Sequence, residues 1–350
     1  MTKDSNVIID ASDFAAGDLI HECYRLCLEK GANVYLDICG TNYEIGRADV
    51  GGFMQTLLTT ASDKQLSTPR AIMEAKINWA DKFIRIVTIH NKNFLANVDP
   101  EKITLWSKNY YPTFEKMITK DWLLTYFPTH GMTQNAKMSL EEFTDFYYDA
   151  CIVDYKKQGA RIKKLQDVVD KGERVHIKAK GTDLTLGIKG RLAAGADSGR
   201  RNIPDGECFT GPEETVTEGY ITFDYPQNRD GNEVTNIRFD FKKGEIVKFS
   251  ADTGQKFLAK VLNDHPGNRR LGELGIGMNP KIKNYIKDIL FDEKIMGTVH
   301  LALGKAYEEA RGGGKNKGTT HWDMIKDLRH KGSLVTVDDK AVVAEGKVLV

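Results

Sequence analysis

The chain has 350 residues, of which 41% are hydrophobic and 28% are charged, and a formal net charge of +1. This composition is ordinary for a globular protein, and the near-neutral charge gives no electrostatic case for binding nucleic acid or an anionic membrane surface. No apolar run approaches the roughly 20 residues that a membrane-spanning helix requires, and the first residues do not form a signal peptide. The odd, scattered set of cysteines favours reduced thiols. We therefore expect a cytoplasmic protein without nucleic-acid or membrane partners.

The first part of the chain alternates between strand and helix patterns. Strands are predicted at 7–10, 33–38 and 81–89, and helices at 13–30, 72–79, 104–119 and 139–155. This order favours a mostly parallel sheet with helices on its faces. Ser139 and Glu142 form a capping box at the start of the last helix. We expect an N-terminal α/β domain over residues 1–156.

No nucleotide cofactor is expected in this first domain. Gly40-Thr41 and Gly51-Gly52 lack the spacing of a dinucleotide-binding or phosphate-binding loop.

The pattern changes after a charged helix predicted at 156–172. Residues 174–190 alternate between apolar and polar and predict a hairpin. Further strands are predicted at 218–225, 236–241, 245–250 and, around an Asp-Asp-Lys turn, within 333–350; helices are predicted at 255–262 and 280–287. We expect a C-terminal α+β domain with much antiparallel sheet over residues 157–350.

His321 and Asp323 are separated by a single residue, Trp322. Side chains two apart on a strand point the same way, so an extended 319–324 segment would present an imidazole and a carboxylate to one point. The alternative is a surface strand with incidental polar residues. The spacing alone does not decide between these interpretations.

His300 is predicted to precede a helix over residues 301–311. Tyr307 follows two helical turns later and would share a face with His300. Gly304 and Ala306 would keep that face open to close approach. A lone histidine in an apolar stretch is more often a satisfied core residue, so the local pattern leaves both roles open.

Two glutamates lie beside turn residues. Glu207 follows Pro204-Asp-Gly206, and Glu273 lies between Gly272 and Gly275. Such a backbone can aim a carboxylate inward, although an isolated glutamate is usually exposed to solvent.

These candidates together form a set of nitrogen and oxygen donors: Glu207, Glu273, His300, His321 and Asp323. Such donors suit divalent zinc, cobalt or manganese. They lie far apart in the sequence, so a folded domain must bring them together. That arrangement is typical of a catalytic site rather than of a zinc knuckle.

Four ordered segments carry a family resemblance. They read N-x-P-x-G-E-x-F-x-x-P at 202–212, L-G-E-x-x-x-G at 271–277, H-x-A-x-G-x-A-Y at 300–307 and H-x-D at 321–323. The chain resembles the aminopeptidase T, aminopeptidase S and PepS family of two-metal exopeptidases. By this resemblance, relatives are expected to begin a few dozen residues earlier, with a leader that this chain would lack.

The resemblance implies roles for individual residues. Two divalent ions per chain (zinc, cobalt or manganese) would be bound by Glu207, Glu273, His300, His321 and Asp323. Tyr307 would stabilise the tetrahedral intermediate. Glu273 would also belong to the catalytic machinery, and Glu293 matches an acidic position that is an accessory ligand or a proton acceptor.

The implied activity is a metal-dependent aminopeptidase that hydrolyses the first bond of peptides with a free amino terminus, in a homodimer. The alternative of another class is an iron(II) ring-cleaving dioxygenase of the dihydroxypyridine type. Those enzymes have a histidine at the position of Glu273 and lack a carboxylate at Glu207, so both glutamates disfavour it. A non-catalytic metal-stabilised binding protein would be expected to have lost Tyr307 or the turn glycines.

Overall fold

The computed structural model describes residues 2–38, 52–91, 93–95, 97–229 and 232–350. The chain divides into two units, Met1–Tyr147 with Arg200–Ile203, and Tyr148–Gly199 with Pro204–Val350. Cys39, Gly40, Thr41 and Gly51 lie outside the described residues. The described cysteines are all free thiols, as expected.

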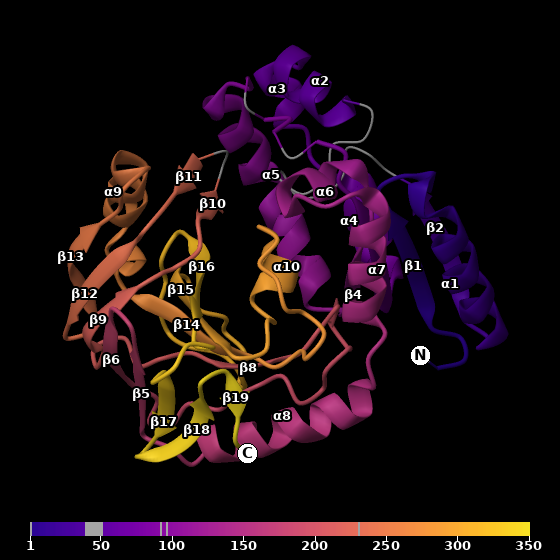
Figure 1. Cartoon of the computed structure of the whole chain (residues 1–350). Helices are drawn as coiled ribbons and strands as arrows, with labels where there is room; N and C mark the ends of the chain where they lie inside the picture. Colours follow the sequence, from indigo (N-terminus) through magenta and orange to yellow (C-terminus); the bar gives the residue numbers. More distant parts are fainter. Residues whose placement is uncertain (1, 39–51, 92, 96, 230–231) are drawn as a thin grey trace. The chain divides into compact units, whose positions relative to one another are not determined.

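The first unit contains a five-stranded sheet in which every neighbouring pair is parallel. Its order is β2 (Asn33–Ile38), β1 (Asn6–Ala11), β3 (Lys82–Thr88), β4 (Asp121–Phe127) and β7 (Asn202–Ile203). The predicted parallel sheet is confirmed (Figure 1). Strand β4 was not predicted from the sequence. Its apolar run Trp122-Leu-Leu-Thr-Tyr-Phe127 lacks the alternation of apolar and polar residues that would indicate a strand.

The helices of this part follow the strands along the chain. They are η1 (Phe14–Ala16), α1 (Gly17–Glu29), α2 (Phe53–Thr60), α3 (Asp63–Leu66), α4 (Ala71–Trp79), α5 (Pro100–Ile118), α6 (His130–Ala136) and α7 (Leu140–Cys151). Ile20 and Cys27 of α1 bury their side chains in one cluster with Val7 and Ile9 of β1. This packing places an apolar helix face on the sheet, as the β-α-β order predicts.

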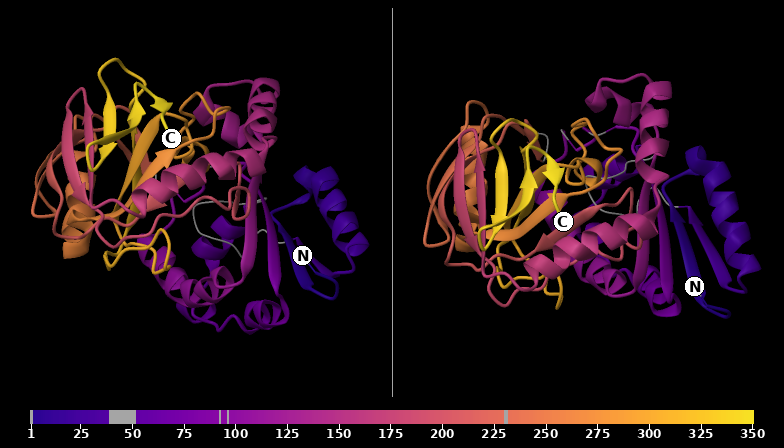
Figure 2. Two further views of the ribbon diagram at one scale, coloured as in Figure 1. Left: turned by 90° about the horizontal axis from the view of Figure 1, so that it is seen from below. Right: turned by 60° about the horizontal axis from the view of Figure 1, so that its bottom comes forward.

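The second unit contains an eight-stranded antiparallel sheet. Its order is β13 (Glu245–Ser250), β12 (Arg238–Lys242), β9 (Glu218–Thr222), β6 (Thr182–Gly187), β5 (Arg174–Ala179), β17 (Leu334–Val337), β18 (Lys340–Ala344) and β19 (Lys347–Val348). The predicted hairpin is β5 and β6. Asp338 and Asp339 both have positive φ in the turn between β17 and β18, as a tight hairpin requires. Figure 2 shows the yellow carboxyl-terminal strands in two views.

A four-stranded antiparallel sheet shares a hydrophobic core with the larger sheet. Its order is β16 (His321–Asp327), β15 (Thr298–Gly304), β14 (Leu271–Gly277) and β8 (Glu207–Thr210). Figure 1 shows β14, β15 and β16 side by side. Helices α8 (Tyr155–Val169) and α9 (Gln255–Asp264) contribute to the same core. Smaller elements are the hairpin β10 (Gln227–Arg229) and β11 (Asn232–Val234), η2 (Pro266–Arg269) and α10 (Ile289–Asp292).

Two predicted helices are wrong. Residues 301–311 are not helical, because residues 298–304 pair on both sides as the central strand β15. Residues 280–287 are not helical either, because their amides bind side chains instead of helix carbonyls: Lys281 N–H donates to Asn279 Oδ1 at 3.0 Å and Ile286 N–H to Asp292 Oδ1 at 2.8 Å. Both segments carry enough apolar residues to imitate a helix.

Among the helices of the described ranges, none is long and apolar enough to cross a membrane.

The capping box at the start of α7 is present. Ser139 Oγ accepts from Glu142 N–H at 3.1 Å, and Glu142 Oε2 accepts from Ser139 N–H at 2.7 Å. We expect Ser139→Ala to lower the free energy of unfolding by about 1 kcal/mol, because an amide at the helix start loses its acceptor. Urea unfolding followed by circular dichroism measures this. Ser139→Asp, which keeps an acceptor, should be close to wild type; equal loss in both variants would contradict a capping role.

Candidate metal centre

The pleat of the four-stranded sheet separates apolar side chains from candidate metal donors. On β16, Trp322 and Met324 lie in the hydrophobic core, so His321 and Asp323 project from the opposite face. On β15, His300 likewise projects opposite the core residues on either side of it. The predicted alternation around Trp322 is confirmed.

Strands β8 and β14 follow the same rule. Cys208 and Leu274 face the core, so Glu207 and Glu273 project from the other face. A register shift between Leu271 and Glu273 places Glu273 opposite Ala302. A bulge of this kind re-aims the side chains that follow it, and here it puts Glu273 on the face that carries the histidines.

A missing side chain makes room for His300. Gly275 pairs with His300 across β14 and β15. A Cβ atom at Gly275 would lie 2.0 Å from both Cε1 and Nε2 of the imidazole. The His300 ring therefore lies over the strand at Gly275, in space that only glycine leaves open.

The first group of donors consists of Glu207, Glu293 and His300, whose ligand atoms lie within 4.8 Å of one another. His300 Nε2 is 3.1 Å from Glu273 Oε1 and 3.3 Å from Glu207 Oε2. One ring nitrogen thus faces two carboxylates. His300 is fully buried and both glutamates are buried.

The second group consists of Glu273, His321 and Asp323, again within 4.8 Å. His321 Nε2 is 3.6 Å from Glu273 Oε2 and 3.5 Å from Asp323 Oδ1. Glu273 therefore directs one oxygen toward His300 and the other toward His321. The structure brings together all the donors that the sequence suggested, and places Glu273 between the two histidines.

The donor set fits divalent metal ions. Among the described residues, Glu207 Oε2 and Glu273 Oε2 are buried without a hydrogen-bond partner, which is costly unless something binds them. His321 Nδ1–H donates to the Lys305 carbonyl at 2.7 Å, which leaves Nε2 as the ring nitrogen that faces the carboxylates and can bind an ion. Such a carbonyl partner is the usual support of a metal-binding histidine.

The charges of the site hold protons on both imidazoles in the metal-free protein. Burial lowers the pKa of His321, but Asp323 and Glu273 outweigh it and raise the pKa to about 10. Burial opposes Glu273 and Glu207 in the same way at His300, whose pKa is raised to about 9. Since only a neutral imidazole binds a metal, ion binding near pH 7 must displace these protons.

The pKa values of Glu207 and Asp323 are shifted in opposite directions. Burial raises the pKa of Glu207 to about 8, against the lowering effect of Lys294. Burial also acts on Asp323, but the imidazole of His321 outweighs it and lowers the pKa to about 2.

Tyr307 lies beside the second group, although not by the predicted route. It is in the irregular segment after β15, so it shares no helix face with His300. Its ring centroid is 4.9 Å from that of His321 and 6.2 Å from that of Phe209. Although 47% of the residue surface is exposed, desolvation of the hydroxyl and the charges of Glu273 and Asp323 raise its pKa well above the ordinary value. The phenol therefore stays neutral and able to donate.

Sequence reasoning did not single out Lys294. This lysine is fully buried and its Nζ contacts Glu293 and Glu207. The apolar residues on both sides of it, Ile289-Leu-Phe291 and Ile295-Met296, were the available signal.

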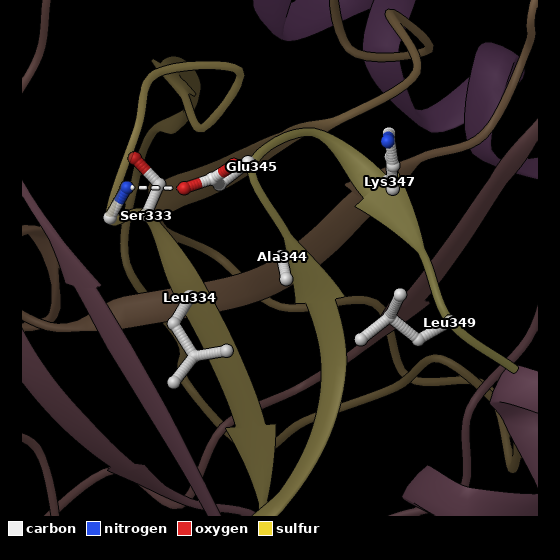
Figure 3. A pocket seen from close by; sticks show the side chains of 7 residues that line it. Ser333, Leu334, Ala344, Glu345, Lys347 and Leu349 are labelled. Atoms are coloured by element: carbon white, nitrogen blue, oxygen red, sulfur yellow. Dashed lines mark hydrogen bonds between the residues drawn. The ribbon is translucent and has the colours of Figure 1, made fainter.

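Two pockets differ in their relation to the donors. An open pocket of about 400 Å³ lies at the carboxyl-terminal strands and contains none of the donors (Figure 3). A second pocket, of about 190 Å³, reaches His321 and Asp323 and is also lined by Tyr285, Ile289 and Trp322. The smaller pocket is therefore the one that adjoins the candidate chemistry.

Two adjacent groups of histidine and carboxylate side chains on one face of a sheet are typical of a metal-dependent hydrolase. A family model described as thermophilic metalloprotease (M29) matches residues 1–347. The chain belongs to this M29 metalloprotease family. The resemblance found in the sequence is thereby confirmed, and the dioxygenase alternative is not supported.

Curated relatives and a solved structure agree with this family. Aminopeptidase PepS of Streptococcus thermophilus is 28% identical over 293 residues, which cover 72% of this chain and 70% of that protein. Aminopeptidase T of Thermus thermophilus is 35% identical over 147 residues, 39% of this chain and 36% of that protein. The structure of wild-type AmpT from Thermus thermophilus has a TM-score of 0.82 at 21% identity and covers 100% of this chain and 95% of that one. This chain therefore shares its α/β and α+β fold.

The role of Gly275 in leaving room for the His300 ring can be tested. We expect Gly275→Ala to displace the His300 ring and to weaken ion binding and turnover by about 10- to 100-fold, as loss of ligand support does in metal sites. Gly275 does not have a positive φ, so the effect is steric rather than backbone strain.

The measurements are metal titration calorimetry and peptide hydrolysis. Gly17→Ala is the matched control, because Gly17 is helical and a Cβ there has nothing within 4 Å. Wild-type ion affinity in Gly275→Ala would show that His300 is not held over this strand.

Proposed function

We propose that this protein is an aminopeptidase that uses two divalent metal ions per chain to hydrolyse the first bond of peptides with a free amino terminus. The observation that carries the proposal is Glu273, whose two carboxylate oxygens face two different histidines, at 3.1 Å from His300 and 3.6 Å from His321. A carboxylate shared between two donor groups suits a pair of neighbouring ions.

The ligands divide evenly between two ions in this proposal. Glu207, His300 and Glu273 would hold one ion, and Asp323, His321 and Glu273 would hold the other. Each set would offer one imidazole and one carboxylate of its own, together with the shared Glu273. Nitrogen and oxygen donors of this kind suit zinc, cobalt or manganese.

When bound, such ions lower the pKa of a water molecule and polarise the carbonyl of the scissile bond. The chain's own residues supply the rest. Tyr307, neutral because its pKa is raised, donates its hydroxyl hydrogen to the substrate oxygen as negative charge develops there. Glu293, at the edge of the first group, accepts a proton from the attacking water and passes it to the leaving amine.

The names of the relatives support the substrate class. PepS and aminopeptidase T are both named as aminopeptidases, and this chain matches 72% of its length to the former. We extend that activity to this chain, together with the expectation of a cytoplasmic homodimer.

The decisive experiment compares a peptide with a free amino terminus and the same peptide acetylated. We expect the purified protein with zinc, cobalt or manganese to release single residues from the free peptide only, because the amine must bind in the site to place the first bond. A chelator should abolish the release and added metal should restore it.

Other outcomes would change the assignment. Equal cleavage of free and acetylated peptides would indicate an endopeptidase. Oxygen uptake with a dihydroxypyridine and iron(II), without peptide cleavage, would establish the ring-cleaving class instead.

Tyr307→Phe tests the role of the phenol. The variant keeps the ring that packs on His321 and removes only the hydroxyl. We expect normal ion binding and a turnover lower by about 10²-fold or more, as when an oxyanion donor is removed. Steady-state kinetics and metal titration measure both quantities. Wild-type turnover would limit Tyr307 to a packing role.

A further inference from the structure

A fully buried ammonium group lies beside the first donor group. Lys294 has no exposed surface, and its Nζ donates to Glu293 Oε1 and lies 3.4 Å from Glu207 Oε1. Burying a lysine is strongly unfavourable unless its charge is paired. None of the roles assigned above involves this residue.

The backbone of Lys294 is fixed to the segment that carries Glu207. Lys294 O accepts from Asn279 N–H at 3.0 Å, and the Asn279 side chain donates to Asp205 O at 2.9 Å. Asp205 precedes Glu207 by two residues. A Cβ at Gly277, the β14 partner of Glu207, would lie 2.9 Å from the Lys294 carbonyl carbon. The ammonium and the carboxylate are therefore built on connected, closely packed backbone.

The contact also determines which oxygen of Glu207 faces the histidine. Oε1 faces Lys294, and Oε2 lies 3.3 Å from His300 Nε2. The two oxygens of a carboxylate are rigidly linked, so holding one orients the other. The same ammonium holds one oxygen of Glu293.

We propose that Lys294 is a positioning residue, which orients Glu207 for ion binding and Glu293 for proton transfer by contacting one oxygen of each. This inference rests on the proposed two-metal aminopeptidase function, in which Glu207 is a ligand and Glu293 the proton carrier.

Geometry and charge make opposite predictions here. Removing a positive charge close to a divalent ion would, by Coulomb's law alone, strengthen ion binding. Losing the orientation of a ligand weakens it. Weaker binding in a variant that keeps a positive charge at this position, such as Lys294→Arg, therefore reports on position and not on charge.

A matched control exists in the same unit. Among the described residues, Lys326 is the other buried lysine, and its Nζ contacts Lys180 O at 3.0 Å and Asp224 at 2.9 Å. These partners belong to neither donor group. Lys326→Met thus removes an equally buried ammonium without touching the candidate ligands.

The experiment measures zinc binding by calorimetry and peptide hydrolysis in Lys294→Met, Lys294→Arg and Lys326→Met. We expect Lys294→Met to bind one zinc ion about 10- to 100-fold more weakly, the usual effect of losing a ligand's supporting partner. Its kcat should fall with little change in KM. Lys294→Arg keeps the charge but not the shape, and should show the same losses in a stably folded protein. Lys326→Met should lower thermal stability and leave zinc binding and kcat unchanged.

A double-variant cycle with Glu293→Gln isolates the second contact. If Lys294 acts on kcat through Glu293, Lys294→Met should lower kcat much less in the Glu293→Gln background than in wild type. Unchanged or tighter zinc binding in Lys294→Met, or full activity in Lys294→Arg, would overturn the positioning role. Failure of the wild-type protein to bind zinc would instead overturn the proposed function itself.

Discussion

The alternation of side chains across one four-stranded sheet is the constraint on which the site depends. Core residues such as Trp322 and Leu274 hold one face of this sheet against the hydrophobic core, which forces their neighbours His321 and Glu273 to the opposite face. A shift of register by one residue would exchange the two faces. The burial of the core thus also fixes the position of the five candidate ligands, which lie on strands rather than on loops.

Many charged side chains share the face of the four-stranded sheet that carries the candidate ligands, because they pack closely against groups of opposite charge. Gly275 leaves the space that the His300 ring occupies. Glu273 lies between two imidazoles, and Lys294 contacts the two remaining carboxylates of the first group. Like charges at this separation are unfavourable unless cations lie between them. In the proposed enzyme, metal ions and a buried ammonium together supply those cations.

Fold and function rest on different observations in this protein. The AmpT structure shares the fold at 21% identity, which by itself says nothing of the chemistry. The family match over residues 1–347 establishes a metalloprotease. The arrangement of donors around Glu273 supports the proposed pair of ions, whereas the aminopeptidase activity is supported by the family and the named relatives.

The sequence by itself determined the parallel sheet of the first unit, the hairpins of the second, the capping box at Ser139 and the common orientation of His321 and Asp323, because each leaves a local pattern of period or turn residues. Strands β14 and β15 left no such pattern. Every residue of both is buried, so apolar and small residues occupy both faces and their alternation disappears. The glycines of β14 therefore resembled a turn and β15 resembled a helix. Only the tertiary structure decided that Glu273 lies between the two histidines and that Lys294 contacts Glu207 as well as its neighbour Glu293. The reason is that the positions of Glu273 and Glu207 depend on pairing between segments that are distant in the sequence.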